Sequence, residues 1–399
     1  MRTALIVVGA LVALAAVAVG AVLWVTRSPE PSAFYDPPAE LPAEPGTLIR
    51  SEPYAAGVPD GAEGWRILYT STGRDGAPVA VSGVVIGPAD PPPGARPVLA
   101  YAHGTTGVAR GCAPSLTDDP LFEMPALRSA PARGWVVVAT DYPGLGTPGP
   151  HPYLDGVSEG RAVLDAVRAA GRIDGGPELS SRVVITGVSQ GGHATLFAAQ
   201  LAPPYAAELE VMGAAPAEPA TDLATLLGRA SGEGGKVLTA EAVYAWSRLY
   251  PELSFDEAVR PRARRLARAV ARRCLVGPER FVTALGAAVL PQWLLAIDVT
   301  RDPRWAARLA QNTPRGPIAA PLLVTQGGRD AIVLPDVSRA EVRARCRRGE
   351  RVEYREDPEA NHLTLPARAG DEIVAWAAER FAGRPVPAAC VGLPPGAGG

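Results

Sequence analysis

The stretch VVITGVSQGGHATLFAAQ, residues 183–200, decides the fold. It begins with β-branched apolar residues, which favour a buried strand, and it ends with residues that favour a helix. Between the two, Ser189 is flanked by Gly187 and Gly191, so the chain must turn sharply at a serine. Strand, tight turn and helix in this order predict a nucleophile elbow, where the first N–H groups of the helix face a developing oxyanion.

The same G-x-S-x-G pattern recurs as GVSEG at residues 156–160, so the pattern alone does not identify the nucleophile. Ser158 follows the turn-like HPYLDG and has no strand before it. We therefore interpret Ser158 as the N-cap of a helix over residues 158–170, and Ser189 as the nucleophile.

Length and composition indicate a globular protein with a sizeable core. The chain has 399 residues, of which 47% are hydrophobic and 20% are charged. This length suffices for one large domain or two ordinary ones. The net charge of −2 gives no reason to expect a nucleic acid as partner.

The N-terminus predicts export. Residues 3–25 carry no charge, and a run of this length favours an uncleaved membrane anchor slightly over a signal peptide. Residues 16–18, Ala-Val-Ala, nevertheless offer a small-x-small cleavage site. We expect residues 1–27 to be a signal peptide or membrane anchor. Residues 28–60, rich in Pro, Glu, Ala and Ser, are expected to form a linker and N-terminal extension.

Cysteine usage agrees with export. The four cysteines are widely spaced and form no C-x-x-C motif, so no metal site is expected: Cys112, Cys274, Cys346 and Cys390. In an oxidising compartment two disulfides are expected rather than four free thiols. The spacing alone leaves all three connectivities open.

Apolar periodicity predicts an α/β fold with a mostly parallel sheet covered by helices. Strands are expected at residues 65–70, 79–87, 97–102, 135–140, 182–187, 209–215, 321–326 and 351–355. Helices are expected at residues 158–170, 190–201 and 366–382. Early hairpin-like strands followed by βα units favour this class. The core is expected to comprise residues 61–216 and 317–392, and residues 393–399 a disordered tail.

The segment between the strands at 209–215 and 321–326 has little β signal. It contains a basic helical stretch at 258–273 and an apolar one at 283–297. Since so long a connection without structure of its own would be unusual, residues 217–316 are expected to form a helical cap inserted over the sheet. A separate small helical domain is the alternative.

A serine nucleophile needs a base, and in hydrolases of this topology an acid and then a histidine follow the serine. Of the four histidines, only His193 and His362 lie after Ser189. His193 is one helical turn beyond the serine, which places its ring beneath the elbow. His362 lies in the polar loop EDPEANHLTLP and is expected to be the base.

Asp330 is expected to be the acid that orients this histidine. It follows the strand PLLVTQ through Gly-Gly-Arg, and active sites of α/β proteins gather at such carboxyl ends of strands. Its rivals are Asp336, Asp357 and Glu359.

The oxyanion hole is expected to use the backbone N–H of Gln190 and a second N–H from the turn in LAYAHGTTG, residues 99–107. Thr105 is the expected second donor, with Gly104 and Thr106 as alternatives. His103 is expected to orient this turn through hydrogen bonds.

Several motifs together resemble the secretory lipase family of the α/β-hydrolase superfamily. They are YAHGTTG at 101–107, CAPS at 112–115, TDYPGLGTPGPHPYL at 140–154, GVSQGGHA at 187–194, and QGGRD at 326–330 with the Asn-His pair at 361–362. The resemblance spans roughly residues 45–392. It implies an α/β-hydrolase fold with a helical cap, and a catalytic triad of Ser189, Asp330 and His362. It also implies that Cys112 pairs with Cys274, and Cys346 with Cys390.

These observations predict an exported, cofactor-free serine hydrolase, a lipase or esterase that cleaves carboxylic esters through an acyl-enzyme. Lipid or fatty-acyl esters are the expected substrates, and a membrane or lipid surface is a further expected partner. The sequence does not predict an oligomeric state. An acyltransferase with the same triad and a non-catalytic envelope-binding protein are the alternatives.

Overall fold

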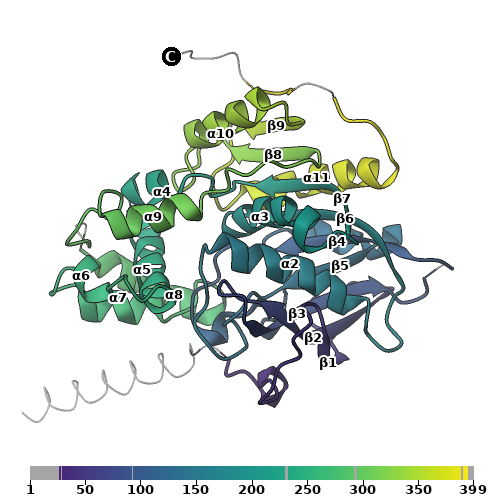
Figure 1. Ribbon diagram of the computed structural model, residues 1–399, viewed down its shortest axis with the longest axis horizontal. Coiled ribbons are helices and arrows are strands. Elements are labelled where there is room, and N and C mark those ends of the chain that lie inside the picture. Colours follow the sequence, from purple (N-terminus) through teal and green to yellow (C-terminus); the bar gives the residue numbers. More distant parts are fainter. Residues whose placement is uncertain are drawn as a thin grey trace, which may run out of the picture.

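The computed structural model describes residue 27 and residues 29–91, 93–229, 232–291, 294–387 and 390–393. These residues form a nine-stranded sheet in the order β1-β2-β3-β5-β4-β6-β7-β8-β9 (Figure 1). The strands are β1 (Leu48–Pro53), β2 (Ala62–Thr72), β3 (Pro78–Pro88), β4 (Arg96–Ala102), β5 (Val136–Thr140), β6 (Leu179–Val188), β7 (Glu210–Ala217), β8 (Leu322–Gly327) and β9 (Val352–Asp357). Pairing is antiparallel from β1 to β5 and parallel from β5 to β9.

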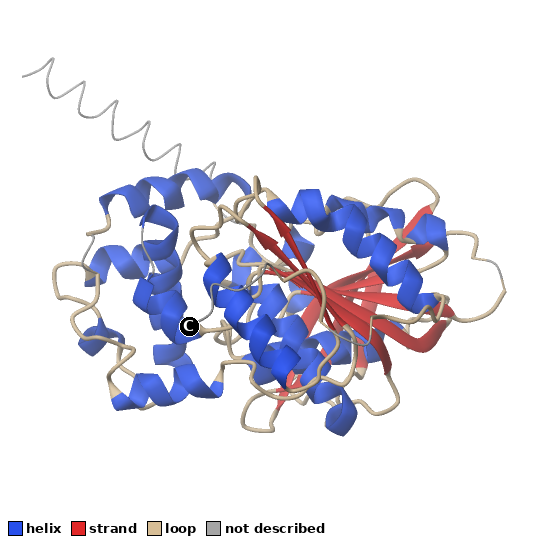
Figure 2. Ribbon diagram, turned by 90° about the horizontal axis from the view of Figure 1, so that it is seen from above, coloured by secondary structure: helices blue, strands red, loops and turns tan. Residues whose placement is uncertain are grey.

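Helices cover both faces of the sheet, as the view in Figure 2 shows. Three of them, α2 (Gly156–Ala170), α3 (Gln190–Tyr205) and α10 (Pro335–Arg347), pack on one face. The other face is covered by α11 (Leu365–Phe381) and 3₁₀ segments. The 3₁₀ segments of the chain are η1 (Ala33–Tyr35), η2 (Arg110–Cys112), η3 (Pro114–Leu116), η4 (Pro125–Ser129), η5 (Pro131–Arg133) and η6 (Gly277–Glu279). With both faces covered, the parallel strands are buried, which accounts for their continuous apolar runs. The fold is that of an α/β-hydrolase, as predicted.

Six helices are inserted between β7 and β8 and lie together at one end of the sheet (Figure 1). They are α4 (Leu223–Arg229), α5 (Gly232–Leu249), α6 (Phe255–Ala258), α7 (Arg264–Ala271), α8 (Arg280–Val289) and α9 (Pro303–Gln311). Their apolar side chains form one cluster, in which Trp246 and Trp305 stack with ring centroids 6.2 Å apart. Val108, Tyr153 and Leu154 from loops of the core also belong to this cluster. The cluster is distinct from those on the two faces of the sheet, and its core-loop members attach the insertion to the rest of the molecule.

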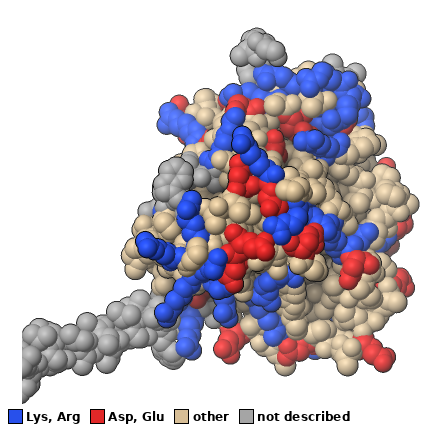
Figure 3. Space-filling view, turned by 60° about the vertical axis from the view of Figure 1, so that its left-hand side comes forward, with Lys and Arg blue, Asp and Glu red and all other residues tan. Residues whose placement is uncertain are grey.

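Acidic and basic side chains are interspersed on the face that the insertion turns outward (Figure 3). Three ion pairs illustrate this: Arg268 with Asp256 at 2.6 Å, Arg304 with Glu257 at 2.9 Å, and Arg308 with Glu252 at 2.6 Å. Helix α8 differs, because Phe281, Leu285 and Val289 are exposed on it.

Some expected boundaries differ in the structure. Residues 48–53, inside the segment expected as a linker, form β1, and Tyr35 in that segment is fully buried. The Pro-rich composition hid these packed residues. Ser158 is not the N-cap of α2, because the side chain of Asp155 accepts the Ser158 N–H and caps the helix.

The expected signal or anchor, residues 1–27, lies outside the described residues except for Arg27. The expected tail lies outside them from residue 394 onward. Across the described part of the chain, no helix combines the length and the apolar character needed to cross a bilayer.

Candidate active site

Ser189 occupies the tip of the turn between β6 and α3. Its backbone has φ 54° and ψ −110°, a region that L-residues rarely adopt. Glycines on either side make the turn feasible. A Cβ atom on Gly187 would lie 2.4 Å from the carbonyl oxygen of Ala102, and one on Gly191 would lie 1.9 Å from it. The elbow therefore requires both glycines.

His362 reaches Ser189 from the loop after β9. Its Nε2 atom lies 3.0 Å from Ser189 Oγ, which is hydrogen-bond distance. The loop is held by Asn361, whose Oδ1 accepts the N–H groups of Leu363 at 3.0 Å and Thr364 at 3.1 Å. The imidazole is thus presented from a loop with a defined shape.

Asp330 contacts the other nitrogen of the ring. The His362 Nδ1–H donates to Asp330 Oδ2 at 2.7 Å. The second oxygen of Asp330 accepts the backbone N–H groups of Ile332 at 2.8 Å and Val333 at 2.9 Å. These bonds hold the carboxylate in place.

The rival acids have other partners. Each forms an ion pair with an arginine: Asp336 with Arg229 at 3.1 Å, Asp357 with Arg368 at 2.6 Å, and Glu359 with Arg329 at 2.5 Å. The structure therefore brings Asp330, and none of these three, to the histidine.

The two expected oxyanion-hole donors belong to Gln190, the residue after Ser189, and to Thr105, in the turn after β4. Neither Gln190 N–H nor Thr105 N–H donates to another described residue. Thr105 and Ser189 line the same cavity, which Gly104 and Thr106 do not. The N–H of Gly104 donates instead to Glu123 Oε2 at 2.7 Å. Of the three residues considered for the turn, Thr105 is the one that lines the cavity together with Ser189.

The turn that carries Thr105 is braced from two sides. His103 Nδ1 lies 2.6 Å from the Gly104 carbonyl oxygen, and its Nε2 lies 3.2 Å from that of Asp141. From the insertion, the N–H of Leu275 donates to the carbonyl oxygen of Thr106 at 2.8 Å. The next residue back, Cys274, forms a disulfide with Cys112. Cys346 and Cys390 form the second disulfide, so the pairing that the resemblance implied is confirmed.

His193 lies beneath the elbow. It is fully buried, and its Nε2 is 2.7 Å from the carbonyl oxygen of Asn312. Its Nδ1 lies 3.5 Å from Glu159, a buried carboxyl that also accepts the Gln190 side-chain amide at 2.6 Å. His193 therefore connects the elbow helix to the end of the insertion.

Sequence reasoning missed a further acid, Glu218, which directly follows β7. It is fully buried, and its Oε2 lies 3.4 Å from His362 Nδ1. Burial and the neighbouring Asp330 carboxyl raise the pKa of Glu218 to about 10. The argument that selected Asp330 could have found it, since Glu218 also stands at the carboxyl end of a parallel strand.

Glu218, Asp330 and His362 each place a ligand atom within 4.8 Å of the others, a grouping that could also hold a cation. The Nδ1 atom and Asp330 Oδ2 already face each other at 2.7 Å. The arrangement is therefore that of a hydrogen-bonded acid and base.

The serine and histidine open into a cavity of about 500 Å³ beneath the insertion. Helices α5 and α8 contribute Val237, Leu238 and Ala287 to its wall, and the core contributes Ile332. Such a mainly apolar wall with a few polar groups at one end is typical of small-molecule sites.

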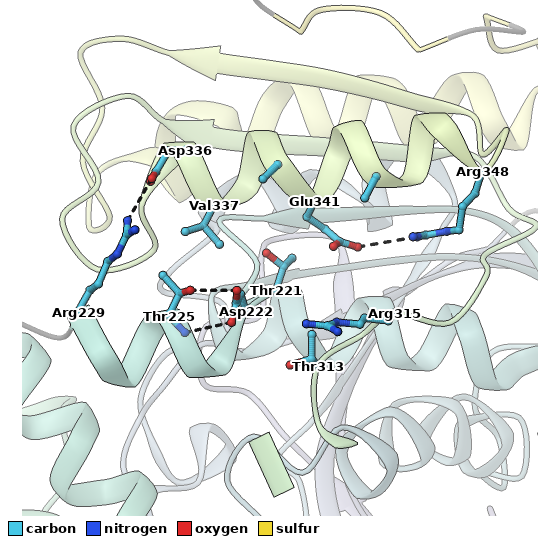
Figure 4. Close-up of a pocket in the computed structure, with 12 residues that line it drawn as sticks. Thr221, Asp222, Thr225, Arg229, Thr313, Arg315, Asp336, Val337, Glu341 and Arg348 are labelled. Carbon is cyan, nitrogen blue, oxygen red and sulfur yellow. Dashed lines mark hydrogen bonds and ion pairs between the residues drawn. The ribbon is translucent and has the colours of Figure 1, made fainter. Parts of the chain in front are cut away.

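A second cavity, of about 420 Å³, lies where both connections to the insertion meet α10 (Figure 4). Arg229 points across it to Asp336, and Glu341 faces Arg348 at 4.0 Å. Its lining contains none of Ser189, His362 and Asp330. We therefore place the candidate active site in the first cavity.

Comparisons with known proteins show the family of the chain. The secretory lipase family model matches residues 119–388. A probable inactive lipase of Mycobacterium tuberculosis is 27% identical, over 90% of this chain and 83% of the relative. Lipase A of Arthroderma benhamiae is 26% identical, over 91% of this chain and 81% of the relative.

Solved structures share the fold. Candida antarctica lipase A has a TM-score of 0.76 at 22% identity, covering 91% of this chain and 89% of that one. A rice cell wall degrading esterase from Xanthomonas oryzae has a TM-score of 0.67 at 20% identity, covering 85% and 98%. The chain thus belongs to the secretory lipase family of α/β-hydrolases, and its activity class is carboxylic ester hydrolysis.

Proposed function

We propose that the chain is an exported lipase or esterase that cleaves esters of apolar acids with Ser189, His362 and Asp330 as its catalytic triad. The observation that carries the proposal is the chain of hydrogen bonds at 3.0 Å and 2.7 Å from serine to histidine to aspartate. This arrangement is the one that activates a serine hydroxyl for nucleophilic attack.

In the proposed mechanism, Ser189 Oγ attacks the ester carbonyl carbon while its proton passes to His362 Nε2. The oxyanion that forms is stabilised by the N–H groups of Gln190 and Thr105. The imidazolium, held by Asp330, returns the proton to the leaving alkoxide, and an acyl-enzyme remains. Water then enters the place that the alcohol has left and attacks the acyl carbon while its proton passes to His362 Nε2. The imidazolium returns this proton to Ser189 Oγ as the acid is released, which regenerates the serine.

Exposed apolar side chains near the cavity support an apolar substrate. Phe281, Leu285 and Val289 lie on one side of α8 and are 65%, 69% and 63% exposed. Phe122 and Leu363 line the cavity and are also exposed. Exposed apolar patches of this kind mark ligand or lipid contacts. We therefore propose fatty-acyl esters as the substrates and a lipid surface as the place where they are met.

The test is hydrolysis of p-nitrophenyl esters from acetate to palmitate by the full chain. Ser189→Ala is expected to abolish turnover, whereas Ser158→Ala, the second serine in a G-x-S-x-G context, is expected to retain it. Preference for long acyl chains supports a lipase, and activity confined to short chains an esterase. Equal loss in both variants contradicts the assignment of the nucleophile.

The mycobacterial relative is named a probable inactive lipase, so a direct test of the nucleophile is needed here. A fluorophosphonate is expected to label the chain at Ser189, because the probe requires an activated serine. Absence of labelling would favour a non-catalytic binding protein. Transfer of the acyl group to added glycerol in place of water would favour an acyltransferase.

Family membership and the two disulfides indicate an exported protein. We propose that residues 1–27 direct this export and that residues 217–316 act as a cap over the site. Deletion of residues 1–27 is expected to shift the protein from the envelope or medium to the cytoplasm. Cell fractionation of the full and the shortened chain measures this shift.

A further inference from the structure

Glu218 is held beside the triad by the backbone on both sides of it. Its N–H donates to the carbonyl oxygen of Thr325 at 2.8 Å, while the N–H of Ser189 donates to the carbonyl of the preceding residue, Ala217, at 2.9 Å. Its φ of 47° lies in the left-handed region, which is unfavourable for glutamate. A residue held in such a conformation next to a reactive centre points to a function.

The fold leaves room for this carboxyl group. A Cβ atom on Gly327, at the end of β8, would lie 2.9 Å from Glu218 Oε1. A larger residue at position 327 would push the carboxyl group away from Asp330 and His362. The glycine therefore allows two acids to approach one imidazole.

Two carboxylates at this place cannot both be charged without a large cost. Glu218 and Asp330 are 0% and 3% exposed, and in the described part of the chain no arginine or lysine pairs with either. Like charges in a buried site force one of the two acids to keep its proton.

Hydrogen bonds decide which acid is neutral. Asp330 accepts two backbone N–H groups, the Nδ1–H of His362 and the side-chain amide of Gln326 at 3.3 Å. By contrast, no described donor makes an aligned hydrogen bond to either oxygen of Glu218. Among the described residues Asp330 thus has four donors and Glu218 has none, so the shared proton belongs on Glu218, whose carboxyl group lies within 4.8 Å of that of Asp330.

We propose that Glu218 is a positioning residue: it remains a neutral carboxylic acid that donates a hydrogen bond to Asp330, so that the two acids together present one negative charge to His362. This inference rests on the proposed function. During the reaction the serine proton moves to His362 Nε2 and on to the leaving alkoxide, while the proton of Glu218 stays between the two acids. Glu218 thereby orients the aspartate without taking part in proton transfer.

Two substitutions separate the charge of Glu218 from its hydrogen bond. Glu218→Gln is neutral and can still donate, so kcat is expected to stay within about threefold of the original value. Glu218→Leu cannot donate, and loss of a hydrogen bond to a charged group is expected to lower kcat about ten- to a hundredfold with little change in KM. Equal kcat in the two variants overturns the proposal.

The pH profile of kcat/KM tests whether Glu218 is charged. Among the described residues, Asp330 and His362 place ionisable atoms within 4.8 Å of the Glu218 carboxyl group. The acid limb of the pH profile of kcat/KM reports the pKa of the histidine. If Glu218 is neutral, Glu218→Gln does not change the pH at which this limb falls. If Glu218 were ionised, the substitution would remove a negative charge and move that limb down by about 1–3 pH units, which overturns the proposal.

A spectroscopic measurement reports the protonation of Glu218 without an activity assay, so it tests the proposal even if the leucine variant does not fold. The infrared difference spectrum of the full chain minus Glu218→Gln at neutral pH is expected to show the carbonyl band of a protonated carboxylic acid. Its absence overturns the proposal.

The matched control for the kinetic measurements is Glu241→Gln, which changes another fully buried acid in the insertion and is expected to leave kcat unchanged.

If the unaltered chain shows no hydrolysis that depends on Ser189, the proposed function fails, whereas the infrared band still reports whether Glu218 is protonated. The two failures are therefore distinguishable.

Discussion

At the scale of single residues, Asp330 is the acid whose removal is expected to matter most. Asp330→Asn keeps the shape of the side chain but removes the charge that stabilises the imidazolium and selects its tautomer. A fall in kcat of about ten-thousandfold is expected, as in triads generally. Asp357→Asn is the control, because Asp357 pairs with Arg368 at 2.6 Å. A greater loss in the control than in Asp330→Asn would show that the acid was wrongly assigned.

Glu241, on α5, is a buried acid that lowers the stability of the folded state as the pH rises. It is fully buried, and neither of its carboxyl oxygens has a hydrogen-bond partner among the described residues. Burial raises the pKa of Glu241 well above its ordinary value. The folded state therefore holds a proton that the unfolded chain releases, and stability is lost as the pH rises above the ordinary carboxyl range.

Glu241→Gln is expected to remove this pH-dependent cost. Its stabilising effect should be near zero at pH 4 and grow by at most about 1.4 kcal/mol for each pH unit above the unfolded pKa. Urea unfolding of both proteins at pH 5 and pH 8 measures the difference. A gain that is the same at both values would mean that Glu241 is charged in the folded state.

At the scale of elements, α8 combines two roles. Ala284 and Ala287 line the cavity, whereas Phe281, Leu285 and Val289 face outward. Replacing the three outward residues with serine is expected to weaken binding to emulsified long-chain esters by about tenfold for each residue, because apolar transfer is lost. Hydrolysis of dissolved acetate esters serves as the control and should not change. An equal fall on both substrates would indicate that α8 only supports the fold.

The two disulfides can be removed separately and their effects compared. Each closes a long loop, with sequence separations of 162 and 44 residues. In the loop-entropy model their loss costs about 5 and 4 kcal/mol of stability respectively. Only Cys112–Cys274 adjoins the turn that carries Thr105. Cys112→Ser with Cys274→Ser is therefore expected to lower kcat, whereas Cys346→Ser with Cys390→Ser lowers only the melting temperature. Steady-state kinetics below both melting temperatures separates the two effects.

At the scale of the whole molecule, the fold class and most of the strands follow from local patterns in the sequence. Continuous β-branched runs such as residues 182–187 predict buried parallel strands, and all eight expected strands are present. Strand β1 was missed, because residues 48–53 lie in a Pro-rich segment with little alternation. Its place is set by pairing with β2, a tertiary contact that no local pattern encodes.

The candidate triad could be predicted from the sequence because its residues match both a known motif and the order of the strands along the chain. Ser189 stands in an elbow pattern, and His362 and Asp330 follow strands in the order that the topology requires. Glu218 was missed because a triad needs only one acid, and Asp330 already meets that need. Its proximity to His362 depends on β7 and β8 being neighbours in the sheet, which emerges only when the chain is folded.

The long separation between Cys112 and Cys274 also imposes an order in time. As the chain is synthesised, Cys112 and Ser189 emerge well before Cys274, and Asp330 and His362 come later still. The turn beside the nucleophile can be fastened only when the insertion has been made and the thiols have met an oxidant. A nascent chain in a reducing compartment therefore carries the nucleophile without its fastened oxyanion turn. We therefore expect the chain to gain its full activity only after export, when the Cys112–Cys274 disulfide has formed.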